Sequence, residues 1–303
     1  MNKQIVFTGT GHKHQILGMQ ISNFLPNKHT QAIGHFVFLD YNPAKVYKPQ
    51  KPRAPDGSFA HPHRGIATFT YVTHGEFEHY DSMGHHETVA EGGAQWMKAG
   101  NGIVHDEDFS QSFQQRGGMG GGLQFWINLP ADVKKEDPEY MPLQATDFHK
   151  IMLPGDAGFL KILIGTYEDK TSKVKTYADQ LMYHLQLNPG KEFLLNANSN
   201  FDYAAFTITG NLRIINTEFS EGNLIVFGGE GDAIKLENHS SQPADIILFG
   251  GEPYTENIVA QGPFVMNSRQ EIAEAYVDYK AGRYGTIKYQ LEEKFNLIDQ
   301  PTA

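Results

Sequence analysis

Four residues in two short segments of the sequence are of the types that bind metal ions. His61 and His63 are separated by one proline, and His105 and Glu107 are separated by one aspartate. Residues i and i+2 of a β-strand point to the same face, so each pair can direct two donor groups into one cavity. The interval between the two pairs leaves room for about two or three strands with glycine turns. We therefore expect the four side chains to converge on one metal ion.

The donor set restricts the chemistry of this site. Three imidazoles and one carboxylate suit a divalent iron, manganese, nickel, copper or zinc ion, and they leave open positions in an octahedral shell for a substrate or dioxygen. The chain has no cysteine, which excludes disulfides, zinc–thiolate sites, iron–sulfur clusters and cysteine nucleophiles. The alternation of strand faces also predicts Phe59 and Ile103 as inward-facing residues of an apolar substrate pocket. We expect Trp126 in the hydrophobic core and His79 at most outside the ligand shell.

Composition excludes several other classes of function. The 303 residues include 25 Lys and Arg against 35 Asp and Glu, a formal net charge of −10. An acidic chain is poorly suited to direct contact with nucleic acid, because phosphates need clustered cations. The apolar run near the N-terminus is too short for a signal peptide, and no stretch approaches the roughly 18 residues of a membrane span. We expect a cytoplasmic protein with no direct nucleic-acid or membrane contact.

The segments that position these residues are typical of β-structure. Thirty-one glycines and 12% aromatic residues accompany short apolar stretches between turns. Examples of these stretches are 67–72, 122–129, 182–187 and 244–249. This rhythm predicts an all-β fold of the sandwich or barrel type. Near the C-terminus, Ser268 and Glu271 form a capping-box pattern that opens a predicted helix at 269–281, which Gly282 closes.

A weak internal repeat predicts two related halves. One strand ends at Gly75 in the first half and another ends at Gly210 in the second, and each is followed by further glycine turns. The paired histidines occur only in the first half. We predict an N-terminal barrel at 1–165 that holds the metal site, and a C-terminal barrel at 166–303 that has no metal ligands and ends in the helix.

Longer motifs surround the candidate ligands. They read HPHRG at 61–65, QWMxAGxGIxHxE at 95–107, GLQFWINL at 122–129, GEGD at 229–232, GEP at 251–253 and QGPFVMN at 261–267. Together these motifs resemble the pirin family of the cupin superfamily, over roughly residues 30–285. The resemblance implies a bicupin, in which two antiparallel β-barrels face each other and one metal ion, usually iron, lies in the N-terminal barrel.

The resemblance also implies which residues bind the metal ion. At one nearby position this chain differs from many related sequences. Carried over position by position, the metal ligands are His61, His63, His105 and Glu107. Many other cupins and many pirins have a glutamate shortly after the first histidine pair, whereas this chain has Ala67. Because the pirin pattern takes its carboxylate from the second pair, this departure affects the surroundings of the site and not the ligand set.

Two functions of different classes follow from the resemblance. Some members resemble flavonol 2,4-dioxygenases of the quercetinase type, which open the ring of quercetin-like aromatic substrates with dioxygen and release carbon monoxide. Glu107 would then be both a ligand and the catalytic base that takes the 3-hydroxyl proton. Other members look like iron-dependent, redox-sensing regulators that bind a transcription factor or metabolic enzyme without turnover. A metal that only stabilises the fold is a third possibility. We favour the dioxygenase.

Overall fold

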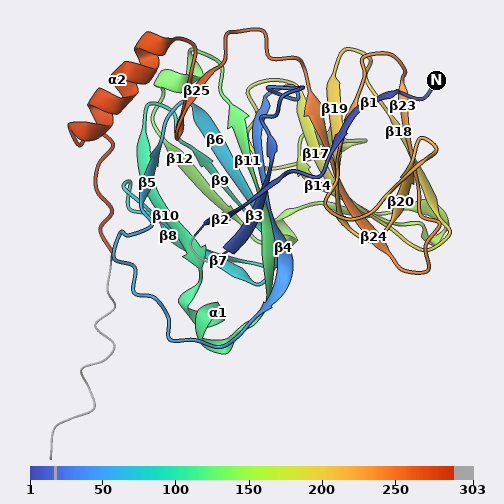
Figure 1. The fold of residues 1–303 in the computed structure, drawn as a ribbon, viewed down its shortest axis with the longest axis horizontal. Helices are drawn as coiled ribbons and strands as arrows, with labels where there is room; N and C mark the ends of the chain where they lie inside the picture. Colours follow the sequence, from blue (N-terminus) through green and yellow to red (C-terminus); the bar gives the residue numbers. More distant parts are fainter. Residues whose placement is uncertain (17–18, 290–303) are drawn as a thin grey trace, which may run out of the picture.

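The computed structural model describes residues 1–16 and 19–289, and it consists mainly of antiparallel strands. Figure 1 shows two β-barrels side by side, with helix α2 on the outer flank of the left-hand barrel. Within the described ranges there are two α-helices, α1 (Gln111–Arg116) and α2 (Arg269–Lys280). Neither of them is long and apolar enough to cross a membrane. The predicted all-β class with a C-terminal helix is confirmed.

The left-hand barrel in Figure 1 contains a large and a small sheet, and we call it the N-terminal barrel. The large sheet has the order β12 (Glu139–Leu143), β9 (Ala94–Lys98), β6 (Ile66–His74), β11 (Gly118–Asn128), β4 (Phe36–Tyr47), β3 (Met19–Leu25) and β2 (His12–Ile16). The small sheet has the order β5 (His61–His63), β10 (Ile103–Phe109), β7 (Glu76–Asp81) and β8 (His86–Ala90).

The right-hand, C-terminal barrel repeats this plan. Its large sheet has the order β1 (Ile5–Gly9), β22 (Leu224–Phe227), β19 (Asp202–Thr209), β24 (Ala244–Gly251), β17 (Gln180–Leu187), β14 (Gly158–Ile164) and β13 (Lys150–Met152). Its small sheet has the order β18 (Glu192–Asn196), β23 (Ala233–Glu237), β20 (Leu212–Ile214) and β21 (Thr217–Phe219). Two hairpins pair β15 (Thr166–Tyr167) with β16 (Lys170–Thr171) and β25 (Val259–Gln261) with β26 (Phe264–Met266). Three 3-10 turns lie at Val133–Lys135, Ala145–Asp147 and Pro154–Asp156.

The two large sheets share one hydrophobic core between the barrels. Phe36 of β4 and Phe125 of β11 pack against Phe249 of β24, with ring centroids 5.2 Å from that of Phe249 in both contacts. Because side chains alternate along a strand, the opposite face of each large sheet looks into its own barrel. The interior of the C-terminal barrel is filled by a second apolar cluster that includes Leu185 and Leu248.

The sheets divide the chain differently from the predicted limits of 1–165 and 166–303. Strand β1 pairs with β22, so the chain begins in the C-terminal barrel, and β13 and β14 belong to that barrel although they precede residue 165. At the other end, α2 returns to the N-terminal barrel, where Asp278 accepts a 2.7 Å hydrogen bond from Arg64. Strand order in space depends on long-range pairing, which composition along the chain does not encode.

A glycine after β5 permits this return. Gly65 has φ +82°, in the left-handed region that other residues rarely adopt, and a Cβ atom there would lie 2.0 Å from the carbonyl oxygen of Val265. We expect Gly65→Ala to lower the free energy of unfolding by about 3 kcal/mol or more, since backbone strain and a backbone clash add. Urea unfolding measures this change.

Gly229→Ala is the matched control. Apart from its two chain neighbours, no atom of the described residues lies within 4 Å of a Cβ placed at Gly229. Its unfolding free energy should stay within about 0.5 kcal/mol of the wild-type value. Equal unfolding midpoints for the two variants would contradict the role of Gly65.

Candidate metal centre

The pairing of β5 with β10 brings the two histidine pairs together. The strands are antiparallel, with His63 opposite Ile103 and His61 opposite His105. Strand β5 is the edge of its sheet, a position that tolerates Pro62 because proline has no N–H to donate. The ligand-type nitrogens of His61, His63 and His105 all lie within 4.8 Å of one another.

The hydrogen bonds of His61 and His63 fix which ring nitrogens face the centre. His61 Nδ1 lies 2.9 Å from the carbonyl oxygen of Phe59, and His63 Nδ1 lies 3.1 Å from that of Pro263. A carbonyl only accepts, so both protons are on Nδ1 and both Nε2 atoms carry a lone pair. His63 Nε2 is buried and has no hydrogen-bond partner among the described residues. An unpartnered buried acceptor of this kind fits a cation.

Distances and burial agree with this interpretation. His61 Nε2 and His105 Nε2 are 2.9 Å apart. Two nitrogens at adjacent positions of one ion, each about 2.1 Å from it, are separated by about 3 Å. His63 is 1% exposed and His105 is fully buried. Burial, with a smaller effect from His61, lowers the pKa of His63 to about 3, and burial lowers the pKa of His105 well below its usual value. Both imidazoles are therefore neutral near pH 7, which is the form that binds metals.

Glu107 lies beside these imidazoles and is held by polar neighbours. Gln124 Nε2 donates to Glu107 Oε2 over 3.0 Å, and Thr70 Oγ1 donates to Oε1 over 3.4 Å. Trp126 Nε1 in turn donates to Gln124 Oε1 over 3.3 Å. Glu107 falls into a second group of possible ligand atoms, together with His79 and His105. His105 thus joins the carboxylate to the three-histidine group.

His79 lies closer to the candidate ligands than its expected position outside the ligand shell. It lies opposite Glu107 in the β7–β10 pairing and is fully buried. Its Nδ1 is 3.9 Å from Glu107 Oε1, its Nε2 donates to Asp81 Oδ2 over 3.2 Å, and its ring stacks on Tyr140. Burial alone would lower the pKa of His79, but the hydrogen bond to Asp81 and the nearby Glu107 carboxylate outweigh it and raise that pKa. The signal in the sequence is His79 and Asp81 at i and i+2 on one strand.

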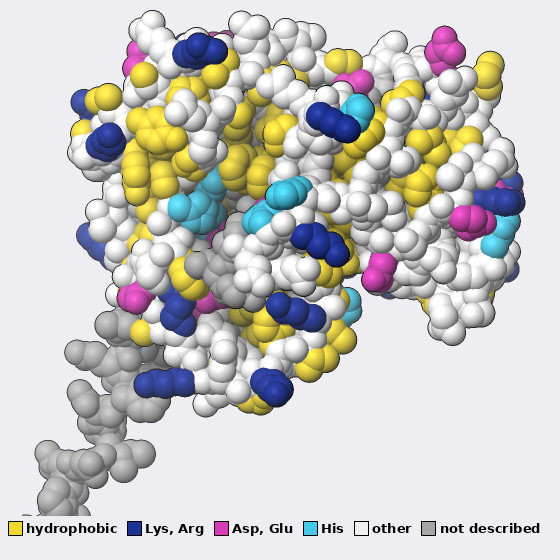
Figure 2. All heavy atoms as spheres, viewed as in Figure 1, with side chains coloured by type: hydrophobic (Ala, Val, Ile, Leu, Met, Phe, Trp, Pro, Cys, Tyr) yellow, Lys and Arg dark blue, Asp and Glu magenta, His cyan; other side chains and the backbone are white. Residues whose placement is uncertain are grey.

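A cavity of about 450 Å³ opens onto the site. It is lined by Ile21, Phe38, Asp40, Asn42, His61, His63, Thr70, Phe77, Glu107, Gly122, Leu123, Gln124, Trp126, Gly262 and Pro263. Figure 2 shows hydrophobic side chains gathered around histidines over a hollow on the N-terminal barrel. Trp126 stacks on Phe38, with ring centroids 4.2 Å apart, so Trp126 is a wall of the cavity and the expectation of a core position is wrong.

The two predicted pocket residues lie outside this lining. Ile103 is fully buried in an apolar cluster with Ile66 and Met97. Phe59 contributes its backbone carbonyl to His61, while its ring packs against the Arg53 guanidinium, 3.7 Å from the ring centroid. Phe59 lies in the turn that precedes β5, where the Ala60 N–H donates to the Gly57 carbonyl, so strand alternation does not reach it. Ile103 is the first residue of β10 and is covered by its apolar neighbours.

In the C-terminal barrel, His184 has different partners. Its Nδ1 lies 2.8 Å from the Tyr71 hydroxyl and its Nε2 lies 2.9 Å from Asp245 Oδ1. Both groups of possible metal ligands in the described part of the chain are in the N-terminal barrel.

Comparisons with known proteins agree with this arrangement. Residues 18–127 match the family model described as Pirin, and residues 182–285 match the Pirin C-terminal cupin domain. A protein of Pseudomonas aeruginosa that carries the provisional name quercetin 2,3-dioxygenase is 32% identical, over 94% of this chain and 99% of its own length. A pirin-like protein of Solanum lycopersicum is 35% identical, over 76% of this chain and 78% of its own.

The fold comparison gives the same result. The crystal structure of quercetin 2,3-dioxygenase from Acinetobacter baumannii superimposes with a TM-score of 0.87 at 27% sequence identity, covering 95% of this chain and 100% of that one. Both halves of the sequence, the two barrels and the histidine cluster thus lead to one conclusion: the chain is a bicupin that belongs to the pirin family.

Proposed function

We propose that the chain holds one divalent metal ion, iron, through His61, His63, His105 and Glu107, and acts as a dioxygenase on flavonol-like aromatic substrates such as quercetin. The observation that carries the proposal is the set of buried imidazole lone pairs at the floor of a cavity of about 450 Å³. Cavities of this size accommodate drug-sized ligands. The names of the Pseudomonas and Acinetobacter relatives support the same substrate class.

Different residues of the chain have different roles in such a reaction. A bound ion supplies open positions at which the hydroxy-ketone of the substrate and dioxygen can meet. Glu107 accepts the substrate's 3-hydroxyl proton, and Gln124 and Thr70 hold its two oxygens while leaving a lone pair free on each. The stacked rings of Phe38 and Trp126 form an apolar wall for a flat ligand.

The alternative is an iron-dependent, redox-sensing regulator. Its support is the net charge of −10, which favours a basic protein partner. The two functions differ in turnover, so one assay separates them.

The first prediction concerns Glu107 as the base. The iron-loaded protein, incubated with quercetin in air, should deplete the visible absorbance of quercetin and release carbon monoxide. Glu107→Gln should lower turnover about 100-fold or more, because the amide cannot accept the proton. Full turnover by this variant with metal in place would show that Glu107 is not the base. No turnover by the wild type with iron, manganese, nickel or copper would contradict the dioxygenase and favour the regulator.

The second prediction concerns the ligands. His63→Ala should reduce bound metal from about one ion per chain to nearly none, measured by elemental analysis after dialysis. His184→Ala is the control from the other barrel, and it should keep its metal. It should still lose about 1–3 kcal/mol of stability, because Tyr71 and Asp245 lose their partner. Equal metal loss in both variants would contradict the ligand assignment.

The third prediction concerns Asp40 in the cavity wall. Asp40 is 9% exposed, and burial raises the pKa of its carboxyl to about 6, against the opposing effects of the Asn23 hydrogen bond and His14. The unfolded chain has the ordinary value of about 3.9. Between these values the folded state holds a proton that the unfolded state releases, so the free energy of unfolding falls as pH rises from 4 to 6.

Asp40→Asn removes this effect. Between pH 4 and pH 7 the metal-free wild type should lose on the order of 2 kcal/mol of stability relative to Asp40→Asn, measured by urea unfolding at both pH values. Buried histidines contribute equally to both proteins, so the difference isolates Asp40. An identical pH dependence would contradict the raised pKa.

A further inference from the structure

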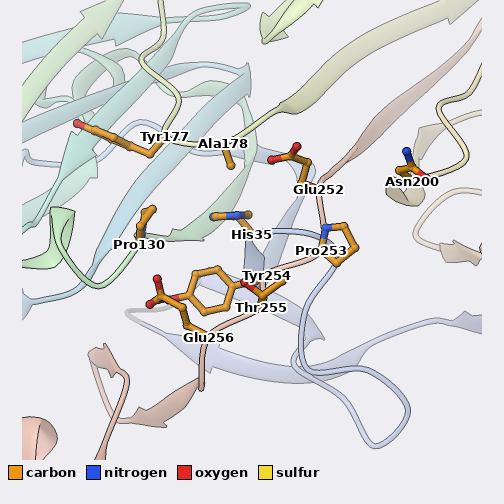
Figure 3. A pocket seen from close by; sticks show the side chains of 10 residues that line it. All are labelled: His35, Pro130, Tyr177, Ala178, Asn200, Glu252, Pro253, Tyr254, Thr255 and Glu256. Carbon is orange, nitrogen blue, oxygen red and sulfur yellow. Dashed lines mark hydrogen bonds between the residues drawn. The ribbon is translucent and has the colours of Figure 1, made fainter.

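A second large cavity lies between the two halves of the chain, away from the metal centre. Its volume is about 460 Å³, and none of the residues that line it lines the cavity at the histidine cluster. The lining is drawn in Figure 3 and consists of His35, Pro130, Tyr177, Ala178, Asn200, Glu252, Pro253, Tyr254, Thr255 and Glu256. This cavity has no role in the proposed dioxygenase reaction.

His35 presents an acceptor to this cavity. Its side chain is more than nine-tenths buried, with 7% of its surface exposed. Its Nδ1 donates to the carbonyl oxygen of Asn128 over 3.1 Å, so in the neutral ring Nε2 carries a lone pair. Nε2 has no hydrogen-bond donor among the described residues, and Figure 3 shows the ring at the centre of the lining side chains. Burial lowers the pKa of His35, which keeps the ring neutral near pH 7.

The charged groups of the cavity are also acceptors. Figure 3 shows Glu252 on one side of His35 and Glu256, with Tyr254, on the other. Glu252 is exposed, and its carboxylate accepts only a long 3.4 Å bond from the backbone N–H of Asp179. Glu256 accepts from the Ala131 N–H, the Tyr254 hydroxyl and the Asn267 side-chain amide, all at Oε2. Neither glutamate has a cationic partner within 4 Å in the described ranges.

The hydroxyls of Tyr177 and Thr255 and the Asn200 amide can also donate, but the charged groups and the His35 lone pair favour a cationic ligand with several donors. A primary ammonium carries three N–H donors and no acceptor, so it can satisfy His35 Nε2 and the Glu252 carboxylate at once. Its alkyl chain can lie against Pro130 and Pro253, and the ring of Tyr254 attracts a cation over its face. A second ammonium would meet Glu256, whereas an anion would meet the like charge of both glutamates.

We propose that this cavity, which we call the His35 pocket, binds a free alkyl diamine through His35 Nε2 and the carboxylates of Glu252 and Glu256. The site is independent of the proposed dioxygenase reaction, so the failure of either proposal leaves the other intact.

Isothermal titration of the metal-loaded protein with 1,4-diaminobutane tests the proposal. We expect saturable binding of one diamine per chain, and no measurable binding of 1,4-butanediol, which has the same length without the charges. Glu252→Gln should weaken the affinity about tenfold or more, because it removes a charge-assisted hydrogen bond. Binding of the diol as tight as that of the diamine, or an absence of saturable diamine binding, would overturn the proposal.

Three further arms keep the result specific. Glu192→Gln removes the same charge from β18 and should leave the diamine affinity within about twofold. Equal weakening by Glu192→Gln and Glu252→Gln would mean general attraction to an acidic surface and would contradict the pocket.

His35→Phe should also weaken diamine binding about tenfold or more. If His35→Phe does not fold, the Glu252→Gln variant, at an exposed position, still tests the proposal. Nα-acetyl-lysine methylamide, which presents the same ammonium as part of a polypeptide, should bind more weakly; if it alone binds, the assignment to a free amine is wrong. Metal content should stay constant in Glu252→Gln.

Discussion

The candidate metal centre depends on one constraint: three imidazoles face one another inside the protein with acceptor nitrogens that lack donors. His63 and His105 are buried, His63 Nε2 has no hydrogen-bond partner in the described structure, and the neighbour of His105 Nε2 is the lone-pair-bearing Nε2 of His61. Such an arrangement is costly unless a cation occupies it, because buried acceptors lose water without compensation. The fold keeps the rings in place through backbone carbonyls at Phe59 and Pro263, which also fix the tautomers. The arrangement is therefore one that could hold a metal ion.

The same alternation of strand faces serves different ends in the two barrels. On β11, Leu123 and Phe125 enter the core shared by the two large sheets, while Gln124 and Trp126 face the cavity of the N-terminal barrel. On β24, the residues that face its own barrel are apolar, as Leu248 illustrates. One scaffold thus yields a cavity where the inner positions are polar and a packed interior where they are apolar. The core between the barrels is built from the outer faces of the two large sheets, so it can stay apolar whatever side chains the inner faces carry.

Features that depend on local sequence patterns could be predicted from the sequence. Features that depend on pairing between distant strands could not. The histidine pairs were readable because i and i+2 share a face, and the helix after Ser268 because capping is local. The position of His79 beside Glu107 depends on which strand pairs with β10, and neither strand encodes that choice. Phe59 and Ile103 were predicted from strand alternation, but Phe59 lies in a turn before β5 and Ile103 is covered by an apolar cluster at the start of β10. The division into barrels likewise follows from pairings between distant segments.

The segment from Pro263 to α2 contributes directly to the histidine cluster. Pro263 supplies the carbonyl that holds His63 and also lines the cavity, although it is 200 positions away in sequence. The segment that follows pairs with Arg64 and continues into α2, whose Ile272 packs in a cluster with Val104 of the ligand-bearing strand. Ordering of His63 and docking of this segment are therefore coupled, because the Pro263 carbonyl fixes the His63 tautomer, and Gly262 and Pro263 complete the cavity lining. A cation that favours the ordered imidazoles must also favour the docked segment, since ligand binding and conformational equilibria are thermodynamically linked.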